Sequence, residues 1–405
     1  MTSEQTVLLT LTGRDRPGVT AAVLAALSAY RVHVLDIEQL VLRGRLVLGI
    51  LVTAPRDAAG LGSAAQQVAE QLDMDIEILR GEGEEDTDRR RDGRAHVTVL
   101  SPRLSAAAVA ALTGRIADTG ANIDRIVRMA RYPVTAIEFD VSGARLAELR
   151  EVLAREASIQ RVDVAVQSAG LLRHGRRLIV MDVDSTLVRG EAIDALAARH
   201  GVGTAVAALT DRAMRGELDF ESSLRQRVAL LEGLAASALD EVYETMELAA
   251  GARTLVRTLK RLGYRFGIVS GGFTQLTDRL AKNLGIHYAR ANQLEVVDGR
   301  LTGRLLGPVV DRAAKATALR EFAADSKVTL DRTIAIGDGA NDLDMLAAAG
   351  LGIAFNAKPL VQEAADAAVN VPYLDTILYL LGISREDLEA DDAAHGIRTP
   401  RPDVP

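Results

Sequence analysis

Residues 178–187, LIVMDVDSTL, decide the interpretation of the second half of the chain. Four apolar residues, typical of a buried strand, run directly into two carboxylates that stand two residues apart. Two further apolar runs end in polar residues, Phe266–Val269 before Ser270 and Thr333–Ile336 before Gly337. Longer helical patterns separate these runs, and the alternation predicts a parallel α/β sheet. Because ligands bind beyond the carboxyl ends of such strands, we expect the functional site there.

The paired carboxylates Asp182 and Asp184 have two simpler interpretations. They can belong to a strand-end turn in which Asp and Ser cap a helix. They can also open a calcium-binding loop, which needs Gly at its sixth position and Glu at its twelfth. Those positions hold Leu187 and Ile193, so the calcium loop is excluded.

Three more clusters follow in order along the chain. In Ser270-Gly271-Gly272 the small residues let backbone N–H groups approach an anion. Lys315 lies in a run of small residues, and Gly337-Asp338-Gly339-Ala340-Asn341-Asp342 offers carboxylates that suit a hard cation such as Mg²⁺. Each cluster alone can equally be a turn or, for Lys315, a solvated helix side chain.

The order of the four clusters resembles the haloacid dehalogenase superfamily of phosphotransferases. Within it, the chain is most similar to the phosphoserine phosphatase family. The similarity rests on Asp182–Val188 with Glu191, on residues 216–220 continuing to Arg227, and on Gly337–Asp342. It covers about residues 175–382.

The resemblance implies the roles of the catalytic residues. Asp182 would be the nucleophile that forms an aspartyl phosphate. Asp184 would protonate the leaving serine oxygen and then activate the hydrolytic water. The phosphoryl oxygens would be held by side chains and by a backbone N–H of the glycine pair: Ser270, Gly271, Gly272, Lys315 and Asn341.

The resemblance also implies a metal site and a substrate site. Mg²⁺ would bind the carboxylates of Asp182 and Asp338 and the backbone carbonyl of Asp184, with Asp342 supporting the ion through water. Glu191 would take the ammonium of phosphoserine and Arg227 its carboxylate, the latter as a bidentate pair. Met214 and Phe220 would wall the site. Outside the motif context, Glu191 and Arg227 would be interpreted as surface charges.

The expected activity is hydrolysis of O-phospho-L-serine to L-serine and phosphate, the last step of serine biosynthesis. A phosphatase of the same fold acting on another phosphomonoester, or on phosphorylated proteins, is the first alternative. Glu191 and Arg227 argue against it, because peptide-bonded phosphoserine lacks both free groups that they match. A catalytically dead amino-acid sensor is the second, and it predicts loss of Asp184, Lys315 or Asp338, which are all present.

The N-terminal half shows one element order twice. Residues 1–80 and 95–170 each follow βαββαβ, the ferredoxin-like order, on both sides of a charged linker at 81–94. The two copies resemble two ACT domains, which are small amino-acid-sensing modules. This resemblance rests on Asp15-Arg16-Pro17-Gly18-Val19 in the first copy and on the repeated element order. The resemblance implies feedback inhibition by L-serine at a loop containing Gly13, Asp15 and Gly18. The second copy has Ser101-Pro102-Arg103 instead, and a structural dimerisation module remains the alternative.

The predicted architecture is therefore a Rossmann-like haloacid dehalogenase domain at 175–383, preceded by two ferredoxin-like α+β domains. Residues 190–250 contain no strong strand pattern and are expected to form a helical cap. The polar, acidic tail at 384–405 is expected to be disordered.

Composition excludes several classes of protein. The 405 residues carry a formal net charge of −7, which does not favour non-specific binding of nucleic acid. The absence of Cys excludes disulfides, thiolate metal sites and cysteine nucleophiles. No uncharged run approaches the roughly 18 residues of a membrane helix, and the N-terminus does not resemble a signal peptide. We expect a cytoplasmic homodimer that acts on a small molecule.

Overall fold

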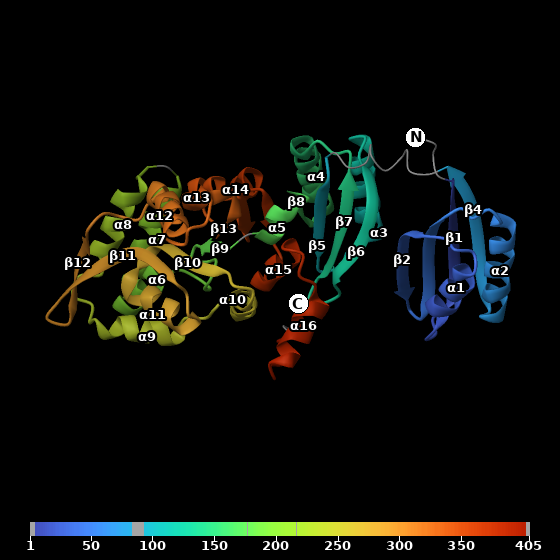
Figure 1. The fold of residues 1–405 in the computed structure, drawn as a ribbon. Coiled ribbons are helices and arrows are strands. Elements are labelled where there is room, and N and C mark those ends of the chain that lie inside the picture. The colour runs from blue at the N-terminus through green and yellow to red at the C-terminus, as the bar shows by residue number, and fades with distance from the viewer. Residues whose placement is uncertain (1–4, 83–92, 176, 216, 402–405) are drawn as a thin grey trace. The chain divides into compact units, whose positions relative to one another are not determined.

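The computed structural model describes residues 5–82, 93–175, 177–215 and 217–401. The chain forms two compact units, Met1–Arg90 and Arg91–Pro405 (Figure 1). The linker predicted at 81–94 falls largely outside the described residues. Within the described ranges, no helix combines the length and the apolar character needed to cross a bilayer.

The first unit is one antiparallel sheet covered by two helices. Its elements are β1 (Gln5–Arg14), α1 (Val19–Ser28), β2 (Val34–Leu42), β3 (Arg45–Thr53), α2 (Ala58–Gln71) and β4 (Met74–Glu82). The strand order is β2-β3-β1-β4. Alternate residues of β1 and β3 are buried in one core with residues of both helices: Val7, Leu9, Leu11, Leu48, Ile50 and Val52. This alternation is what a sheet covered on one face requires.

The second unit begins with the second copy of the same element order. Its elements are β5 (Ala95–Ser101), α3 (Ala106–Asp118), β6 (Asn122–Ala130), β7 (Thr135–Ser142), α4 (Leu146–Gln160) and β8 (Asp163–Ser168). Helices α3 and α4 contribute Leu112, Ile116, Leu149 and Leu153 to a core with the strands. A short helix, α5 (Leu171–Gly175), follows.

In the residues that the structure describes, the phosphatase-like part contributes seven more strands. They are β9 (Leu178–Met181), β10 (Arg265–Phe273), β11 (Tyr288–Val297), β12 (Arg300–Leu306), β13 (Thr333–Gly337), β14 (Leu351–Phe355) and β15 (Ala367–Val369). β9 pairs in parallel with β10 and β13 on its two sides. Ile179 and Met181 of β9 enter the core on one face of the sheet, and Leu178 and Val180 enter the core on the other. Burial on both faces explains the uninterrupted apolar run of this strand.

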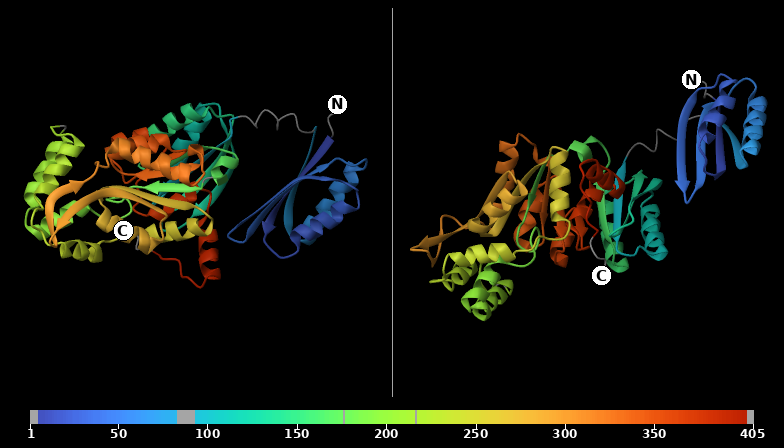
Figure 2. Two further views of the ribbon diagram at one scale, coloured as in Figure 1. Left: turned by 60° about the vertical axis from the view of Figure 1, so that its left-hand side comes forward. Right: turned by 90° about the horizontal axis from the view of Figure 1, so that it is seen from below.

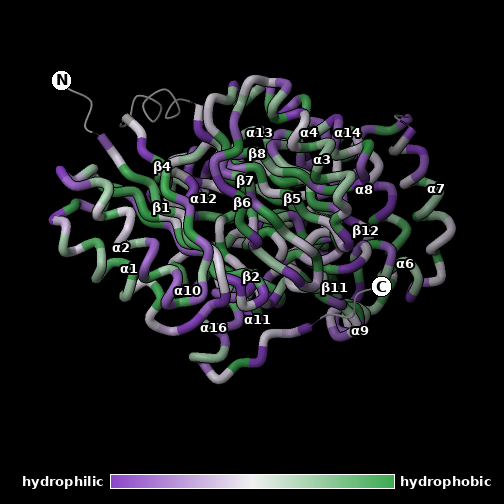
Figure 3. Tube along the Cα trace, turned by 90° about the vertical axis from the view of Figure 1, so that its right-hand side faces the viewer, coloured by the Kyte–Doolittle hydropathy of each residue, from purple (hydrophilic) through white to green (hydrophobic). Residues whose placement is uncertain are grey.

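Helices cover both faces of this sheet (Figure 1). One core contains residues of α10 (Ala252–Arg261), α11 (Thr274–Leu284) and α15 (Ile377–Leu380). The other contains residues of α12 (Arg312–Asp325), α13 (Leu343–Ala348) and α14 (Pro359–Ala364). Figure 3 shows hydrophobic residues concentrated in strands β5, β7 and β8 of the second copy.

A third helical group lies over the end of β11 and β12. It contains α6 (Ala192–His200), α7 (Gly203–Met214), α8 (Phe220–Ala229) and α9 (Ser237–Thr245). Its core includes Leu196, Leu224 and Val228, together with Leu294 of β11 and Leu301 of β12. The strand pair β11–β12 is antiparallel and was not anticipated from the sequence. The cap helices pack against this strand pair.

The second copy of the βαββαβ unit and the phosphatase-like part share one sheet. Its eleven strands run in the order β12-β11-β10-β9-β13-β14-β15-β8-β5-β7-β6, and Figure 2 shows them from two further sides. The two parts meet where Ala165 of β8 pairs antiparallel with Ala367 of β15. The sequence predicts separate domains at 95–170 and 175–383, whereas the structure carries one sheet across that boundary.

A buried ion pair reinforces this junction. Arg173 of α5 and Glu138 of β7 are 4% and 7% exposed, and Arg173 Nη1 donates to Glu138 Oε1 at 3.0 Å. Arg173 also donates to the carbonyl oxygen of Leu380 in α15, which accepts from Gln167 as well. On the other side, Asp163 accepts two backbone hydrogen bonds, from Asn370 and Val371. The Arg173 and Glu138 charges are therefore paired, and the buried Asp163 carboxylate is hydrogen-bonded, as burial requires.

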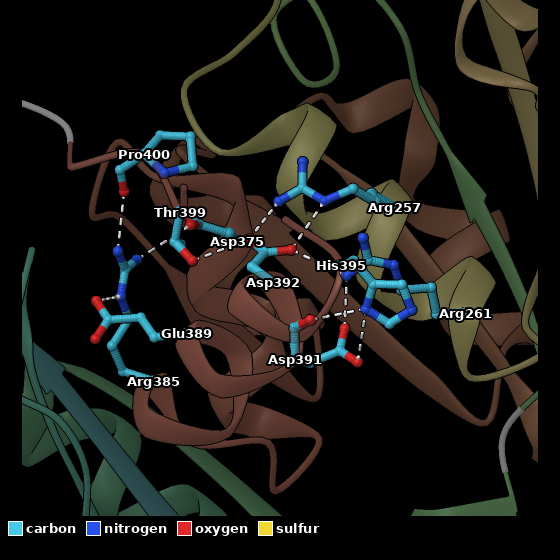
Figure 4. Close-up of polar contacts among 10 residues, drawn as sticks. All are labelled: Arg257, Arg261, Asp375, Arg385, Glu389, Asp391, Asp392, His395, Thr399 and Pro400. Carbon is cyan, nitrogen blue, oxygen red and sulfur yellow. Dashed lines mark hydrogen bonds and ion pairs between the residues drawn. The ribbon is translucent and has the colours of Figure 1, made fainter. Parts of the chain in front are cut away.

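The prediction of a disordered tail is wrong for residues 384–401. Arg385–Ala394 form helix α16, which begins with a capping box between Ser384 and Asp387. Fully buried Asp392 pairs with Arg257 at 2.6 Å and Arg261 at 3.0 Å, and it accepts from Thr399 at 2.9 Å (Figure 4). Two of the acidic residues that indicated disorder, Asp391 and Asp392, thus pair with arginines of α10, which only the tertiary fold brings near.

Replacing Arg173 with alanine tests the junction. We expect Arg173→Ala to lower the free energy of unfolding of the second unit by about 3–5 kcal/mol, because Glu138 stays buried without its partner. Arg128→Ala is the matched control, since Arg128 pairs with Glu386 at the exposed end of the same sheet. That exposed pair is worth less than about 1 kcal/mol. Urea unfolding of the full chain measures both, and equal small losses would contradict the prediction.

Candidate active site

Three neighbouring strands deliver the predicted residues to one edge of the sheet. Asp182 follows β9, Ser270 lies in β10, and Asp338 follows β13. These strands are adjacent and parallel in the order β10-β9-β13, so their carboxyl ends coincide. The backbone N–H of Asp182 donates to the carbonyl oxygen of Ile336 in β13 at 2.9 Å. This hydrogen bond holds Asp182, the candidate nucleophile, at the end of β9.

Lys315 is fully buried and joins two of the carboxylates. Its Nζ donates to Asp182 Oδ1 at 2.6 Å and to Asp342 Oδ1 at 2.7 Å. Burial by itself would lower the pKa of Lys315, but the two carboxylates more than offset this and raise the pKa above its ordinary value. The helix that carries the lysine is capped by Asp311, which accepts from the N–H of Ala314 at 2.8 Å. A solvated helix lysine is therefore excluded.

The acidic group around Lys315 fits a hard cation. Asp182, Asp338 and Asp342 each offer an oxygen within 4.8 Å of the others. Thr186 donates to Asp338 at 2.8 Å and holds that carboxylate in place. Burial, and then repulsion from Asp342, raise the pKa of Asp182 despite the opposing effect of Lys315. Three carboxylates against one ammonium leave excess negative charge, which a divalent cation with oxygen ligands would relieve.

Asp184 lies beside the cation group and is held by two donors. Its Oδ1 accepts from the N–H of Ala192 at 2.9 Å, and its Oδ2 accepts from Ser270 Oγ at 2.9 Å. Burial raises the pKa of Asp184, and both hydrogen bonds oppose the shift. A raised pKa favours the protonated form that a general acid needs.

The Ser-Gly-Gly segment forms an irregularity in β10. Val269 pairs with Arg290 and Phe273 with Asn292, so β10 has two more residues between these pairs than β11. The N–H of Gly272 donates to Ser270 Oγ at 2.7 Å. A Cβ on Gly272 would lie 2.7 Å from Asp184 Oδ2, which explains why glycine is needed there. Such bulges re-aim backbone groups next to active sites.

Glu191 and Arg227 lie on the cap side of the site. Glu191 precedes α6 and accepts from Ser185 Oγ at 3.3 Å. The Glu191 side chain remains partly exposed to solvent. Its pKa is raised to about 7, first by partial burial and then by repulsion from Asp184 and Asp338. A bound cation would draw it back to the charged form.

Arg227, on α8, is half-buried. Its polar contacts are with Thr210 Oγ1 at 3.5 Å and with the carbonyl of Ser223 at 3.4 Å. Within the described parts of the chain, Arg227 forms no ion pair. Burial lowers its pKa, and the Glu191 carboxylate acts in the opposite direction. A desolvated guanidinium without a carboxylate partner is available for an anionic group.

The remaining predicted residues are distributed around this centre. Phe220 begins α8, and its Cζ would lie 3.1 Å from a Cβ on Gly271. Asn341 is half-buried and precedes Asp342. Met214 ends α7, but its side chain lies outside what the structure describes.

The predicted regulatory residues belong to the first unit. Gly13 is near the end of β1, and a Cβ there would lie 2.7 Å from Met74 Cγ. Asp15 is exposed, and Gly18 precedes α1 with a φ of 94°, which glycine adopts without strain.

Two residues with a structural link to the site were missed in the sequence. Thr186 follows Asp182 and Asp184 in the same short motif. A hydroxyl this close to the paired carboxylates could have identified it as a residue of the site. Asn292 lies in β11, is 2% exposed, and donates from Nδ2 to the carbonyl of Gly271 at 2.8 Å. No local pattern in the sequence marks it.

Comparison with known families agrees with this geometry. Residues 179–347 match the family model for haloacid dehalogenase-like hydrolases. Residues 5–78 and 94–167 each match a model for ACT domains. The fold and the site therefore define a haloacid dehalogenase-like hydrolase with two N-terminal ACT domains.

Individual relatives show to which family of haloacid dehalogenase-like hydrolases the chain belongs. A phosphoserine phosphatase of Streptomyces coelicolor is 58% identical over 96% of this chain and 94% of its own length. One of Mycobacterium tuberculosis is 48% identical over 98% of both chains. The crystal structure of a probable phosphoserine phosphatase from Vibrio cholerae covers 74% of this chain and 88% of that chain, with 35% identity and a TM-score of 0.57. The chain belongs to the phosphoserine phosphatase family of enzymes.

Proposed function

We propose that this enzyme hydrolyses O-phospho-L-serine through an aspartyl phosphate on Asp182, with Mg²⁺ as cofactor. The observation that carries the proposal is the position of Asp182 at the end of β9, within 2.6 Å of the Lys315 ammonium and next to Asp184. A carboxylate nucleophile repels a phosphate dianion. Lys315 offsets that repulsion and stabilises charge on the phosphoryl oxygens.

The chain's own residues account for each proton and bond. A carboxylate oxygen of Asp182 attacks phosphorus, and the bond from phosphorus to the serine oxygen breaks while Asp184 donates its proton to that oxygen. Asp184, now ionised, takes a proton from water, whose oxygen attacks phosphorus and releases Asp182 and inorganic phosphate. Ser270, a backbone N–H of the Gly271–Gly272 pair and Lys315 would donate to the phosphoryl oxygens.

The residues present fit a magnesium ion. The ion would be held by carboxylate oxygens of Asp182 and Asp338, with the backbone carbonyl of Asp184 as a third ligand and Asp342 in support. When bound, it would supply positive charge that polarises the phosphoryl group. Thr186 would orient Asp338 towards it.

The cap side of the site supports the choice of substrate. Phosphoserine carries an ammonium and a carboxylate besides its phosphate. Glu191 supplies a carboxylate for the first, and Arg227 supplies a guanidinium without an ion-pair partner in the described chain for the second. Asn341 would orient the phosphoryl group, and Phe220 and Met214 would wall the pocket. The product would be L-serine, which places the reaction at the end of serine biosynthesis.

Release of phosphate from O-phospho-L-serine tests the function directly. We expect strong preference for the free amino acid over phosphoglycolate and over a phosphoserine peptide, because only the free amino acid has both charged groups. EDTA should abolish the activity. Equal rates on all three substrates would keep the Asp182 chemistry but contradict the substrate assignment, and no release from any substrate would favour the sensor alternative.

Arg227→Lys tests the carboxylate assignment. Lysine keeps the charge but loses the planar fork, and we expect a loss of about 1.5–3 kcal/mol in transition-state binding. This corresponds to roughly ten- to a few hundred-fold in kcat/KM. Arg225→Lys is the matched control, because Arg225 lies on the same helix and pairs with Glu221 at the surface. Unchanged kinetics in Arg227→Lys would show that Arg227 does not hold the carboxylate.

The two ACT domains support regulation by the product. L-serine would bind near Gly13, Asp15 and Gly18 of the first unit and lower activity, and the protein would act as a homodimer in the cytoplasm. Titration of phosphatase activity with L-serine tests this, with D-serine as the control for stereospecific binding. We expect inhibition by L-serine alone in the millimolar range. No inhibition by either enantiomer would leave the ACT domains a structural role.

A further inference from the structure

Asn292 is bound to both segments that position the phosphoryl-binding groups. It lies in β11, which contributes no residue to the mechanism above, and it is 2% exposed. Its Nδ2 donates to the carbonyl of Gly271 at 2.8 Å. Its Oδ1 accepts from the backbone N–H of Val310 at 2.8 Å. One partner is an acceptor and the other a donor, so only one orientation of the amide satisfies both.

The peptide unit that Asn292 contacts is one that the chain restrains weakly. The carbonyl of Gly271 and the N–H of Gly272 belong to the same planar group and point in opposite directions. Glycine on both sides allows this plane to rotate at little steric cost. The bulge in β10 also removes this carbonyl from regular pairing with β11. Without Asn292, the carbonyl would lose its side-chain donor, and the bond from the Gly272 N–H to Ser270 Oγ would be left to orient the peptide.

Asn292 therefore determines the direction of the Gly272 N–H. With the carbonyl held by Asn292, the N–H points to Ser270 Oγ at 2.7 Å, on the side of Asp184. A rotated plane would take the N–H away from Ser270 Oγ, and the Ser270 hydroxyl would lose the bond that orients it beside Asp184.

The second hydrogen bond extends to the segment before α12. Val310 directly precedes Asp311, the residue that caps the helix carrying Lys315. One side chain therefore links the glycine pair to the start of the lysine helix. In the proposed function, each segment supplies one side chain to the phosphoryl group: Ser270 from the first and Lys315 from the second.

We propose that Asn292 is a positioning residue that locks the Gly271–Gly272 peptide so that its N–H holds the hydroxyl oxygen of Ser270 in place. The proposal deepens the proposed function and rests on it, because the phosphoryl group is the ligand that the Ser270 hydroxyl would meet.

Two nearly isosteric variants separate the contributions of Asn292. Asn292→Asp keeps the acceptor for Val310 but replaces the donor to Gly271 with a charged oxygen. Asn292→Leu removes both bonds without adding charge. Asn283→Asp and Asn283→Leu are the matched controls, because Asn283 is exposed on α11 and bonded to Arg253. For each variant, calorimetry measures the Kd of inorganic phosphate in Mg²⁺ buffer, alongside kcat/KM on O-phospho-L-serine and the melting temperature.

We expect both Asn292 variants to lose about 10- to 100-fold in phosphate affinity and in kcat/KM, which is less than the roughly 10²–10³-fold cost of removing an oxyanion donor outright, because the Ser270 hydroxyl is still present. The Asn292→Asp defect should shrink towards wild type between pH 8 and pH 5. Burial raises the pKa of the new carboxyl, and its protonated form donates to Gly271 as the amide does. The Asn292→Leu defect should stay constant relative to wild type, and the Asn283 variants should stay within twofold.

Phosphate affinity within twofold of wild type in both Asn292 variants would overturn the proposal, whatever their melting temperatures. A defect in Asn292→Asp that does not diminish at low pH would overturn it as well. If the wild-type enzyme binds phosphate but does not hydrolyse phosphoserine, the proposed substrate is wrong. The phosphate affinities of the Asn292 variants relative to wild type would still decide the role of Asn292. Wild type that binds no phosphate would contradict both.

Discussion

The site is organised around one buried ammonium group. Lys315 has no exposed surface and lies between the carboxylates of Asp182 and Asp342, at 2.6 and 2.7 Å. Removing such charges from water costs several kcal/mol each, and only close pairing offsets that cost. The lysine therefore requires that the ends of β9 and β13 and the start of α12 be brought together. The adjacent position of β9 and β13 in the sheet is therefore what brings Lys315 to the proposed nucleophile, Asp182.

The two copies of the βαββαβ element order differ in how they pack against the rest of the chain. The first forms its own compact unit with a four-stranded sheet. The second extends the phosphatase sheet to eleven strands through β8 and β15. The Arg173–Glu138 pair and the contacts of Asp163 hold that junction, and helix α16 is fixed to α10 by Asp392. The second copy is therefore joined to the phosphatase sheet through paired backbone as well as side chains.

Much of the site could be predicted because its residues follow strands in short motifs. Asp182, Asp184, Ser270 and Asp338 each come at or after the end of an apolar run, and parallel strands deliver such positions to one edge. Lys315 was found only through the family resemblance, since its local sequence is that of an ordinary helix. Asn292 could not be found, because its importance comes from a bulge in a neighbouring strand. The tail was misjudged because its partners, Arg257 and Arg261, lie more than a hundred residues away.

The sequence by itself determined the alternation of strands and helices, the duplicated N-terminal order, and the residue types and spacing of the catalytic motifs. These depend on local periodicity and on residues close together in the chain. The tertiary structure alone decided the shared sheet, the burial of Lys315 between two carboxylates, the contacts of Asn292 and the order in the C-terminal helix. Each of these depends on desolvation and pairing between distant segments, and the free energy of a buried charge or amide is set by partners that only folding supplies.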